Sequence, residues 1–171
     1  QIENIKDFLN KEVIGNKCFA INGFVILNDR DSVIINRKKL KKSVPLELKI
    51  GNNYNFDNYV YKVSKYSKNV RFSSSSDDEL IDLAAIKNKK LILRYWCSGD
   101  RFKPLGMSGM QKISDYLINN KINLFQKDEQ TVLTADDQII WVCGQRIDDS
   151  VKVNKNTKNV LRIKRKLKKV V

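Results

Sequence analysis

Residues 91–121 contain the pattern that most constrains the fold, because an apolar run, a glycine-rich loop and a helical repeat follow each other directly. The run at residues 91–96 is short and rich in large apolar side chains, which is typical of a buried strand. Three glycines and a proline then fall within residues 99–109. Glycine opens backbone conformations that other residues avoid and proline fixes its own, so this punctuation predicts a tightly folded loop. Apolar residues at helical spacing over residues 111–120 predict a helix after it.

Arg94, Arg101 and Lys103 lie on this predicted strand and loop. A rigid strand-to-helix connection that displays cations suits a polyanion. A structural loop whose charges are merely solvated fits the same residues equally well. The local pattern leaves these two interpretations open.

The charge of the whole chain favours an acidic partner. Lysine and arginine total 33 against 19 aspartate and glutamate residues, a net charge of +14. An excess of this size usually indicates nucleic acid, or less often an anionic membrane surface. The hydrophobic content of 42% indicates a globular chain with a real core. No apolar run is long enough to span a membrane, and no secretory signal pattern occurs.

Histidine is absent from the chain, and the three cysteines, Cys18, Cys97 and Cys143, are far apart in sequence. This excludes zinc sites of the usual cysteine and histidine spacing and any histidine-based catalytic triad. We therefore expect no metal site in this chain. Scattered, odd-numbered cysteines fit a reducing cytoplasm, and we expect each to be a small apolar packing residue.

The apolar patterns in most of the remaining sequence predict short strands. Residues 1–9 place their apolar side chains on one helical face without a preceding cap, so we expect the tail of a helix and a piece of a longer protein. Asn22-Gly23 is a strong hairpin signal inside a predicted meander. Leu124 and Phe125 are expected to lead into a return strand, and Gly51-Asn52-Asn53 is expected to be a turn. Strands are expected at residues 17–21, 24–27, 32–36, 46–50, 59–65, 131–134, 139–143 and 160–167.

Two stretches suggest how the chain is divided and where its charge lies. Ser73–Glu79 has the composition of a linker, which predicts a boundary between residues 1–76 and 77–171. Residues 77–157 balance 12 cations with 12 acids, whereas seven cations and no acid follow from Lys158 onward. This favours one basic face in the second half, which is what a folded RNA binds. A solvated tail is the alternative for the final basic strip.

Residues 80–163 resemble the C-terminal domain of tRNA(Ile)-lysidine synthetase. The order and spacing of the pieces carry the resemblance, since each piece alone is weak. Departures from the family pattern are Gln111, Asn123 and Ser150, which stand where lysine, proline and arginine are common. The matching pieces are Leu93-Arg94, residues 99–106, residues 112–115, Lys121-Ile122, residues 139–144, residues 146–148 and Lys152-Val153.

The resemblance implies an α+β fold of mainly antiparallel strands with few helices, in two small sub-domains. The first would be the end of a helix plus a β-rich connecting region, and the second the tRNA-recognition domain. The family's enzyme uses ATP and magnesium to attach lysine to the wobble cytidine of an isoleucine tRNA. That chemistry belongs to an N-terminal domain with a Ser-Gly-Gly-x-Asp-Ser signature, which does not occur here.

We therefore expect this chain to be catalytically silent and to need no cofactor itself. Its implied partners are isoleucine tRNA, gripped at the body and acceptor stem, and the N-terminal catalytic domain of the same polypeptide. The patterns are compatible with a monomer and with a dimer. A stand-alone basic RNA-binding module and a domain that docks on an acidic protein are the competing interpretations.

Cations on the resembling motifs are the candidates for phosphate contacts, because arginine binds phosphate through two bonds and lysine acts as a point charge. Surface charges without a partner are the alternative for each of them. The phosphate-contact candidates are Arg94, Arg101, Lys103, Lys112, Lys121, Arg146 and Lys152. The residues expected to shape loops are Gly99, Asp100, Pro104, Gly106 and Asp148.

Three further features have a structural and a chemical interpretation. Asp100 should accept backbone N–H bonds in its loop, with metal binding as the weaker alternative. Asp148 and Asp149 should brace a loop, with Arg146 as a possible ion-pair partner, rather than act as paired acids. Trp96 and Trp141 lie in apolar runs, which favours core packing over base stacking.

Overall fold

The computed structural model describes residues 3, 6, 8, 17–37, 43–67, 71 and 73–168. Glu3, Lys6 and Phe8 are helical, as predicted for the N-terminal segment. The rest of that predicted helix and residues 38–42 lie outside the described residues.

Antiparallel strands dominate the described chain, as predicted, and two α-helices and two 3-10 helices are short. In the part of the chain that is described, no helix has the length and apolar character needed to cross a membrane. The elements are β1 (Lys17–Ile21), β2 (Phe24–Asp29), β3 (Ser32–Arg37), β4 (Leu46–Leu48), β5 (Asn53–Phe56), β6 (Tyr59–Ser67), β7 (Asp78–Asp82), η1 (Leu83–Ile86), β8 (Leu91–Tyr95), β9 (Arg101–Phe102), β10 (Gln111–Lys112), α2 (Ile113–Asn119), α3 (Leu124–Asp128), β11 (Thr131–Ala135), β12 (Gln138–Val142), β13 (Arg146–Ile147), η2 (Asp149–Val151) and β14 (Asn159–Leu167).

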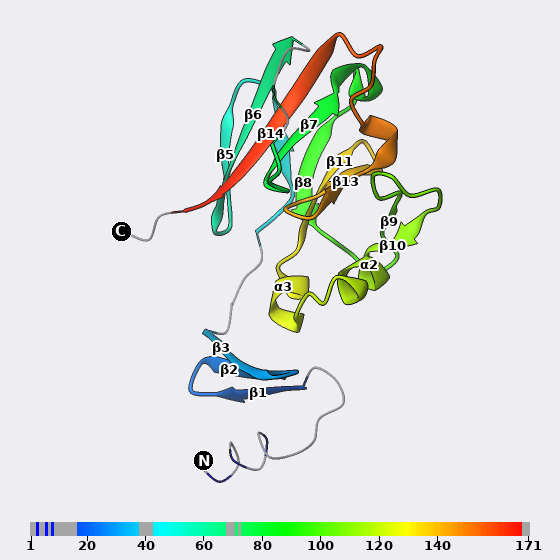
Figure 1. Cartoon of the computed structure of the whole chain (residues 1–171). Coiled ribbons are helices and arrows are strands. Elements are labelled where there is room, and N and C mark those ends of the chain that lie inside the picture. The colour runs from blue at the N-terminus through cyan, green and yellow to red at the C-terminus, as the bar shows by residue number, and fades with distance from the viewer. Residues whose placement is uncertain are drawn as a thin grey trace.

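The first three strands form the predicted meander, in the order β1-β2-β3 (Figure 1). Asn22 and Gly23 both have positive φ, 46° and 78°, which is the geometry of a two-residue hairpin turn. Among the described strands, those of this sheet pair only with each other.

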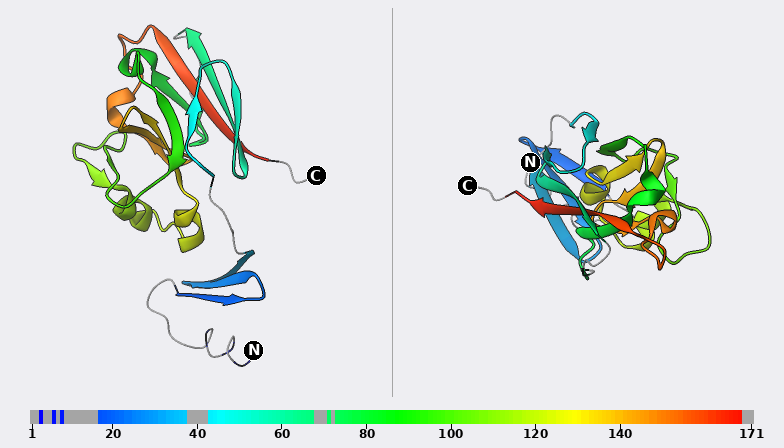
Figure 2. Two further views of the ribbon diagram at one scale, coloured as in Figure 1. Left: turned by 180° about the vertical axis from the view of Figure 1, so that it is seen from behind. Right: turned by 90° about the horizontal axis from the view of Figure 1, so that it is seen from above.

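Two larger sheets face each other across the main core (Figures 1 and 2). One has the order β13-β12-β11-β8-β4 and the other β5-β6-β14-β7. Trp141 of the first sheet and Tyr61 of the second are fully buried and meet edge to face, with ring centroids 6.3 Å apart. The Tyr61 hydroxyl and the Thr131 Oγ1 atom are hydrogen-bonded at 2.9 Å. The core therefore fixes the two sheets against each other.

Strands from both sides of residue 76 share these sheets. β14 pairs with β6 along nine residues and with β7 on its other edge, and β4 pairs with β8. Asp78 and Glu79, which the sequence placed in a linker, belong to β7 instead. The division at residue 76 stays a prediction, and residues 43–67 are joined to the C-terminal half by their strand pairing.

One local prediction was wrong, and a second was right only in part. Leu124 and Phe125 begin the helix α3, because Asn123 caps it by accepting a bond from the Gln126 amide at 3.0 Å. Gly51 lies in a turn, as predicted, with φ 97°, but Asn53 already begins β5, and a second turn follows at Asp57, where φ is 48°. Asparagine is common in turns and caps, so its position alone gave no register.

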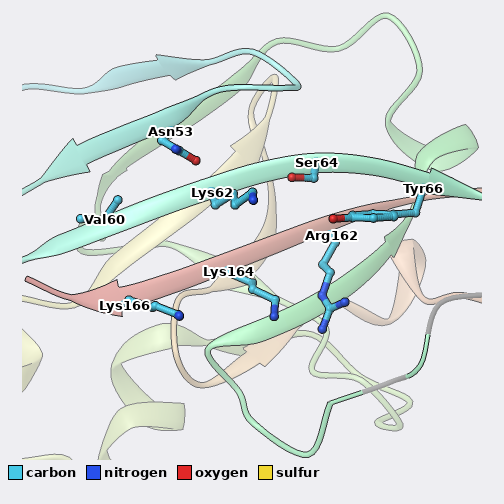
Figure 3. Close-up of a pocket in the computed structure, with 8 residues that line it drawn as sticks. All are labelled: Asn53, Val60, Lys62, Ser64, Tyr66, Arg162, Lys164 and Lys166. Carbon is cyan, nitrogen blue, oxygen red and sulfur yellow. The ribbon is translucent and has the colours of Figure 1, made fainter.

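The four-stranded sheet has an apolar inner face and a polar outer face. Along β14, Leu161 and Ile163 point into the core, and Arg162, Lys164 and Lys166 point outward (Figure 3). Arg165 falls on the inner face, where it is ion-paired with Asp77 and lies over the Tyr59 ring at 4.4 Å. The alternation of side chains along β14 therefore gives one outward row of cations and one half-buried cation on the inner face.

Candidate nucleic-acid interface

The glycine-rich loop lies on a small, well-packed frame. β9 pairs with β10, and the Ile113 amide donates to the Asp100 carbonyl at 2.9 Å as α2 begins. Phe102, Ile113 and Leu117 are buried in a second core cluster. The predicted helix over residues 111–120 is α2, and the buried face that the sequence indicated holds the loop in place.

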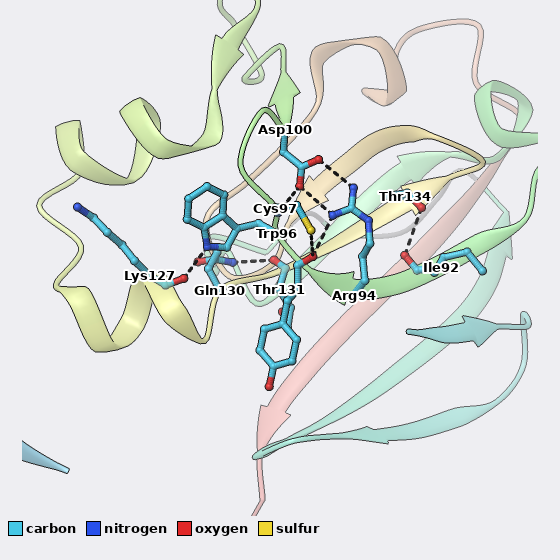
Figure 4. A network of polar contacts seen from close by, with 10 residues as sticks. Ile92, Arg94, Trp96, Cys97, Asp100, Lys127, Gln130, Thr131 and Thr134 are labelled. Carbon is cyan, nitrogen blue, oxygen red and sulfur yellow. Dashed lines mark hydrogen bonds and ion pairs between the residues drawn. The ribbon is translucent and has the colours of Figure 1, made fainter. Parts of the chain in front are cut away.

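Arg94 is bound internally by Asp100 (Figure 4). The two guanidinium nitrogens donate to the two carboxylate oxygens at 2.8 and 3.0 Å, and Asp100 also accepts the Cys97 amide at 2.8 Å. Gly99, at φ 93°, permits the turn between them. The hydrogen bonds that Arg94 donates to the Asp100 carboxylate are the main cause that raises the pKa of Arg94. Arg94 thus ties the end of β8 to the loop and has fewer free donors for a phosphate than an unpaired arginine would.

The next part of the loop is fixed to the chain around β13 and η2. Asp148 is buried and accepts the Lys103 amide at 2.7 Å and the Ser150 amide at 2.9 Å. The Leu105 amide donates to the Ile147 carbonyl at 3.0 Å. Pro104 and Asp148 form an isolated bridge between the two segments. The Lys103 backbone is thereby held rigidly, whereas its side chain remains near the surface.

Asp149 lies between two lysines. Its carboxylate is 3.6 Å from the Lys103 ammonium and 3.0 Å from that of Lys152, and it accepts the Gly106 amide at 3.1 Å. The Gly106 amide and then Lys152 lower the pKa of Asp149. The two acids therefore brace the loop and orient Lys103 and Lys152. No ion pair joins either acid to Arg146 within the described chain.

Arg101 and Lys112 lie directly opposite each other on the β9–β10 ladder. Both are exposed, and within residues 73–168 neither has an ion pair or a side-chain hydrogen bond. Like charges in this position repel each other, so the pair costs stability unless an anion lies between them. Together with Lys103 and Lys152, these two residues form what we call the loop surface.

Lys121 and Arg146, the other two phosphate-contact candidates, are not part of the loop surface. Lys121 is exposed after the end of α2, with φ 56°. Arg146 is exposed at the start of β13. Burial raises the pKa values of Glu79 and Tyr116, and the charge of Arg146 offsets part of that rise. Sequence reasoning did not find a second opposed pair, Lys62 and Lys164, on the outer face of the four-stranded sheet. The sequence shows cations at alternate positions of β6 and β14, but only the pairing of these strands places Lys62 opposite Lys164.

Neither tryptophan is displayed as a free stacking platform. Trp141 is fully buried, in agreement with the predicted core packing. Trp96 is half-buried and donates through Nε1 to the Lys127 carbonyl at 2.6 Å (Figure 4). Cys143 is buried, which raises the pKa of its thiol to about 12. Cys97 is exposed, so the packing role expected for it is wrong. The side chain of Cys18 lies outside the description, and the described residues include no cluster of His, Cys, Asp or Glu arranged to hold a metal ion.

Comparison with known proteins identifies the second half of the chain. The family model described as "TilS substrate C-terminal domain" matches residues 91–165, from β8 into β14. Residues 91–165 form a TilS C-terminal domain. This range contains the whole loop surface and all seven cations that the sequence singled out.

Curated relatives and a solved structure of a TilS C-terminal domain are similar to a longer part of this chain than residues 91–165. The tRNA(Ile)-lysidine synthase of Bacteroides thetaiotaomicron is 26% identical over 163 residues, which cover 94% of this chain and 35% of that protein. That of Parabacteroides distasonis is 32% identical over 153 residues, covering 85% and 33%. The chain thus spans about a third of these relatives' length. A crystal structure of a TilS C-terminal domain has the same fold, with a TM-score of 0.66, 20% identity, and coverage of 74% of this chain and 98% of that one.

Proposed function

We propose that this chain is the tRNA-binding C-terminal part of a tRNA(Ile)-lysidine synthetase and is not itself catalytic. It grips the body and acceptor stem of an isoleucine tRNA in the cytoplasm. The parent enzyme attaches lysine to the wobble cytidine with ATP and magnesium, which its N-terminal domain binds. Binding energy collected by the present chain helps to orient the anticodon in that distant site.

The family match over residues 91–165 is the observation that carries this proposal. The loop surface supports it, because exposed cations on a rigid frame suit a folded RNA. Such an RNA closes its deep groove to side chains and is bound mainly through phosphates, hydroxyls and shape. The opposed pair of Arg101 and Lys112 offers two charges to one stretch of phosphates.

Filter binding of isoleucine tRNA, with an unrelated tRNA and a plain RNA duplex as controls, tests the proposal. We expect salt-sensitive binding with a preference for the isoleucine tRNA. Equal binding to all three RNAs would favour a stand-alone RNA-binding module. Affinity that does not change with salt would contradict both functions, since each neutralised phosphate contributes roughly 0.7–0.9 to the log–log slope.

A further inference from the structure

The outer face of the four-stranded sheet is hollowed between β5, β6 and β14 (Figure 3). The hollow has a volume of about 340 Å³ and belongs to the opposite side of the sheet from the core. Neither the loop surface nor the core accounts for its side chains. The residues of the hollow that matter here are Asn53, Lys62, Tyr66, Arg162, Lys164 and Lys166.

Strand register concentrates positive charge in this hollow. Lys62 lies directly opposite Lys164 across the β6–β14 ladder. Arg162 and Lys166 flank Lys164 on the same face, two residues away in each direction, which is about 7 Å along a strand. Successive phosphates of an extended nucleic acid strand have a comparable spacing. A row of cations with one like charge directly opposed destabilises a sheet unless an anion covers it.

One acid satisfies only part of this charge. Asp78 accepts two bonds from Arg162, both at 2.7 Å, and is 2.9 Å from the Lys164 ammonium. Lys62 and Lys166 have no ion pair or side-chain hydrogen bond to any described residue. Four cations and Asp78 leave the face with a net charge of +3. Asp78 therefore holds two cations in a fixed geometry and leaves the other two for a ligand.

An aromatic ring completes the face. Tyr66 is 41% exposed and lies beside Arg162 at one end of the hollow, with Lys166 at the other end (Figure 3). A ring of this kind on a sheet can stack on a base, and a basic groove can follow the attached backbone. A duplex presents phosphates along its sides but keeps its base faces stacked inside. An unpaired strand presents both features.

We propose that this hollow binds an unpaired RNA strand, with its phosphates on Lys62 and Lys166 and one base stacked on Tyr66. The proposal deepens the RNA-binding function proposed above and rests on it. It assigns a second contact surface, separate from the loop surface, to the unpaired part of the bound RNA. An acidic protein segment would match the charge but would not use the ring as a stacking platform.

Fluorescence anisotropy with the full chain tests this assignment, using labelled octauridylate and a labelled RNA duplex as probes. Lys62→Gln with Lys166→Gln should weaken octauridylate binding about tenfold and reduce the log–log salt slope by about 1.4, or ~0.7 for each phosphate. Tyr66→Ala should weaken octauridylate binding at least about fivefold and leave duplex binding unchanged, whereas Tyr66→Phe should keep both affinities. Lys87→Gln with Lys90→Gln removes two exposed charges elsewhere and serves as the matched control. Circular dichroism melts establish that each variant is folded.

Octauridylate binding by the Lys62/Lys166 variant that equals that of the Lys87/Lys90 control would overturn the proposal. A Tyr66→Ala variant that loses as much duplex as octauridylate affinity would also overturn it, and so would displacement of octauridylate by polyglutamate at equal concentration. If the chain binds isoleucine tRNA while these results are obtained, only the sheet hollow is refuted. If the chain binds no RNA of any kind, the proposed function itself fails.

Discussion

The loop surface and the sheet hollow are both cationic, but their charges are held in different ways. In the loop, Asp149 is placed between Lys103 and Lys152, and backbone bonds to the neighbouring Asp148 fix the segment. On the sheet, the cations project from a continuous ladder over a packed core. The conformation of the loop depends on its bonds to Asp148 and Asp149, whereas the conformation of the sheet is fixed by strand pairing.

This difference separates cations that build the fold from cations that remain available to a ligand. Arg94 belongs to the first group, because its guanidinium donates hydrogen bonds to both carboxylate oxygens of Asp100. Arg101 and Lys112 belong to the second group, as do Lys62 and Lys166 on the sheet. Each surface contains a directly opposed like-charge pair, Arg101 with Lys112 and Lys62 with Lys164, although Lys164 is also ion-paired with Asp78. Opposed like charges cost stability, so their presence on two rigid frames is more informative than the net charge of the chain.

The largest effect should come from the support beneath the sheet hollow. Gly144 has φ 73°, and a Cβ atom there would overlap the guanidinium of Arg165, which is half-buried and bound to Asp77. We expect Gly144→Ala to reduce the free energy of unfolding by about 3 kcal/mol, from backbone strain and the displaced ion pair. Urea unfolding measures this change.

Gly51→Ala is the matched control for that substitution. Gly51 also has positive φ, 97°, but no atom lies within 4 Å of the added Cβ. Gly51→Ala should therefore cost only the strain, about 1–2 kcal/mol. Equal losses in the two variants would show that Arg165 does not support the sheet as described.

Removing the opposed pair of the loop surface should affect binding and not folding. We expect Arg101→Gln with Lys112→Gln to weaken isoleucine tRNA binding about 30-fold, equivalent to about 2 kcal/mol, because two charge-assisted contacts are lost. The melting temperature should stay the same or rise, since the repulsion between the two charges is removed. Filter binding and thermal melts, with Lys87→Gln and Lys90→Gln as the control, measure both properties.

Arg94→Gln should behave in the opposite way. It breaks the bond pair to Asp100 and should lower the free energy of unfolding by about 1–2 kcal/mol. Any loss of tRNA affinity should be small once the variant is shown to be folded. Unchanged stability together with a large loss of affinity would move Arg94 into the ligand-binding group and erase the distinction between the two groups.

The smallest effect concerns Glu79, at the edge of the four-stranded sheet. Desolvation raises its pKa from 4.5 to about 7, with Asp78 adding to the rise and Arg146 opposing it. The folded chain therefore holds this proton more tightly than the unfolded chain, so stability falls as pH rises from about 4.5 to about 7. Because Glu79 is only partly buried, we expect Glu79→Gln to gain only about 1 kcal/mol at pH 8, or about 2–4 °C in Tm.

Thermal melts of wild type and Glu79→Gln between pH 4 and pH 8 measure this effect. The two proteins should have the same Tm at pH 4, where the carboxyl group is protonated in both states, and diverge above pH 5. A constant difference across this range would mean that Glu79 does not titrate as described.

The sequence predicted the parts of the molecule that depend on local signals. Asn22-Gly23 fixed a hairpin, and the apolar spacing after residue 111 located α2 with Ile113 and Leu117 buried. It missed α3 and β5, because asparagine marks a cap, a turn or a strand end with equal ease.

Long-range pairing was beyond the reach of the sequence. The like-charge pair of Lys62 and Lys164 unites residues about a hundred positions apart, and no local pattern could reveal it. The same holds for Arg94, whose pairing with Asp100 the sequence did not indicate. Charge at a position could be read from the sequence, but whether that charge was already satisfied could not.

The salt dependence of isoleucine tRNA binding tests most directly whether unpaired, opposed cations bind phosphate while internally paired cations do not. We expect the log–log slope of wild type to shrink by about 1.8 in the Arg101→Gln, Lys112→Gln double variant, or ~0.9 for each phosphate on a duplex, and to stay unchanged in Arg94→Gln. Equal slopes in wild type and the double variant, or a reduced slope in Arg94→Gln, would contradict the account.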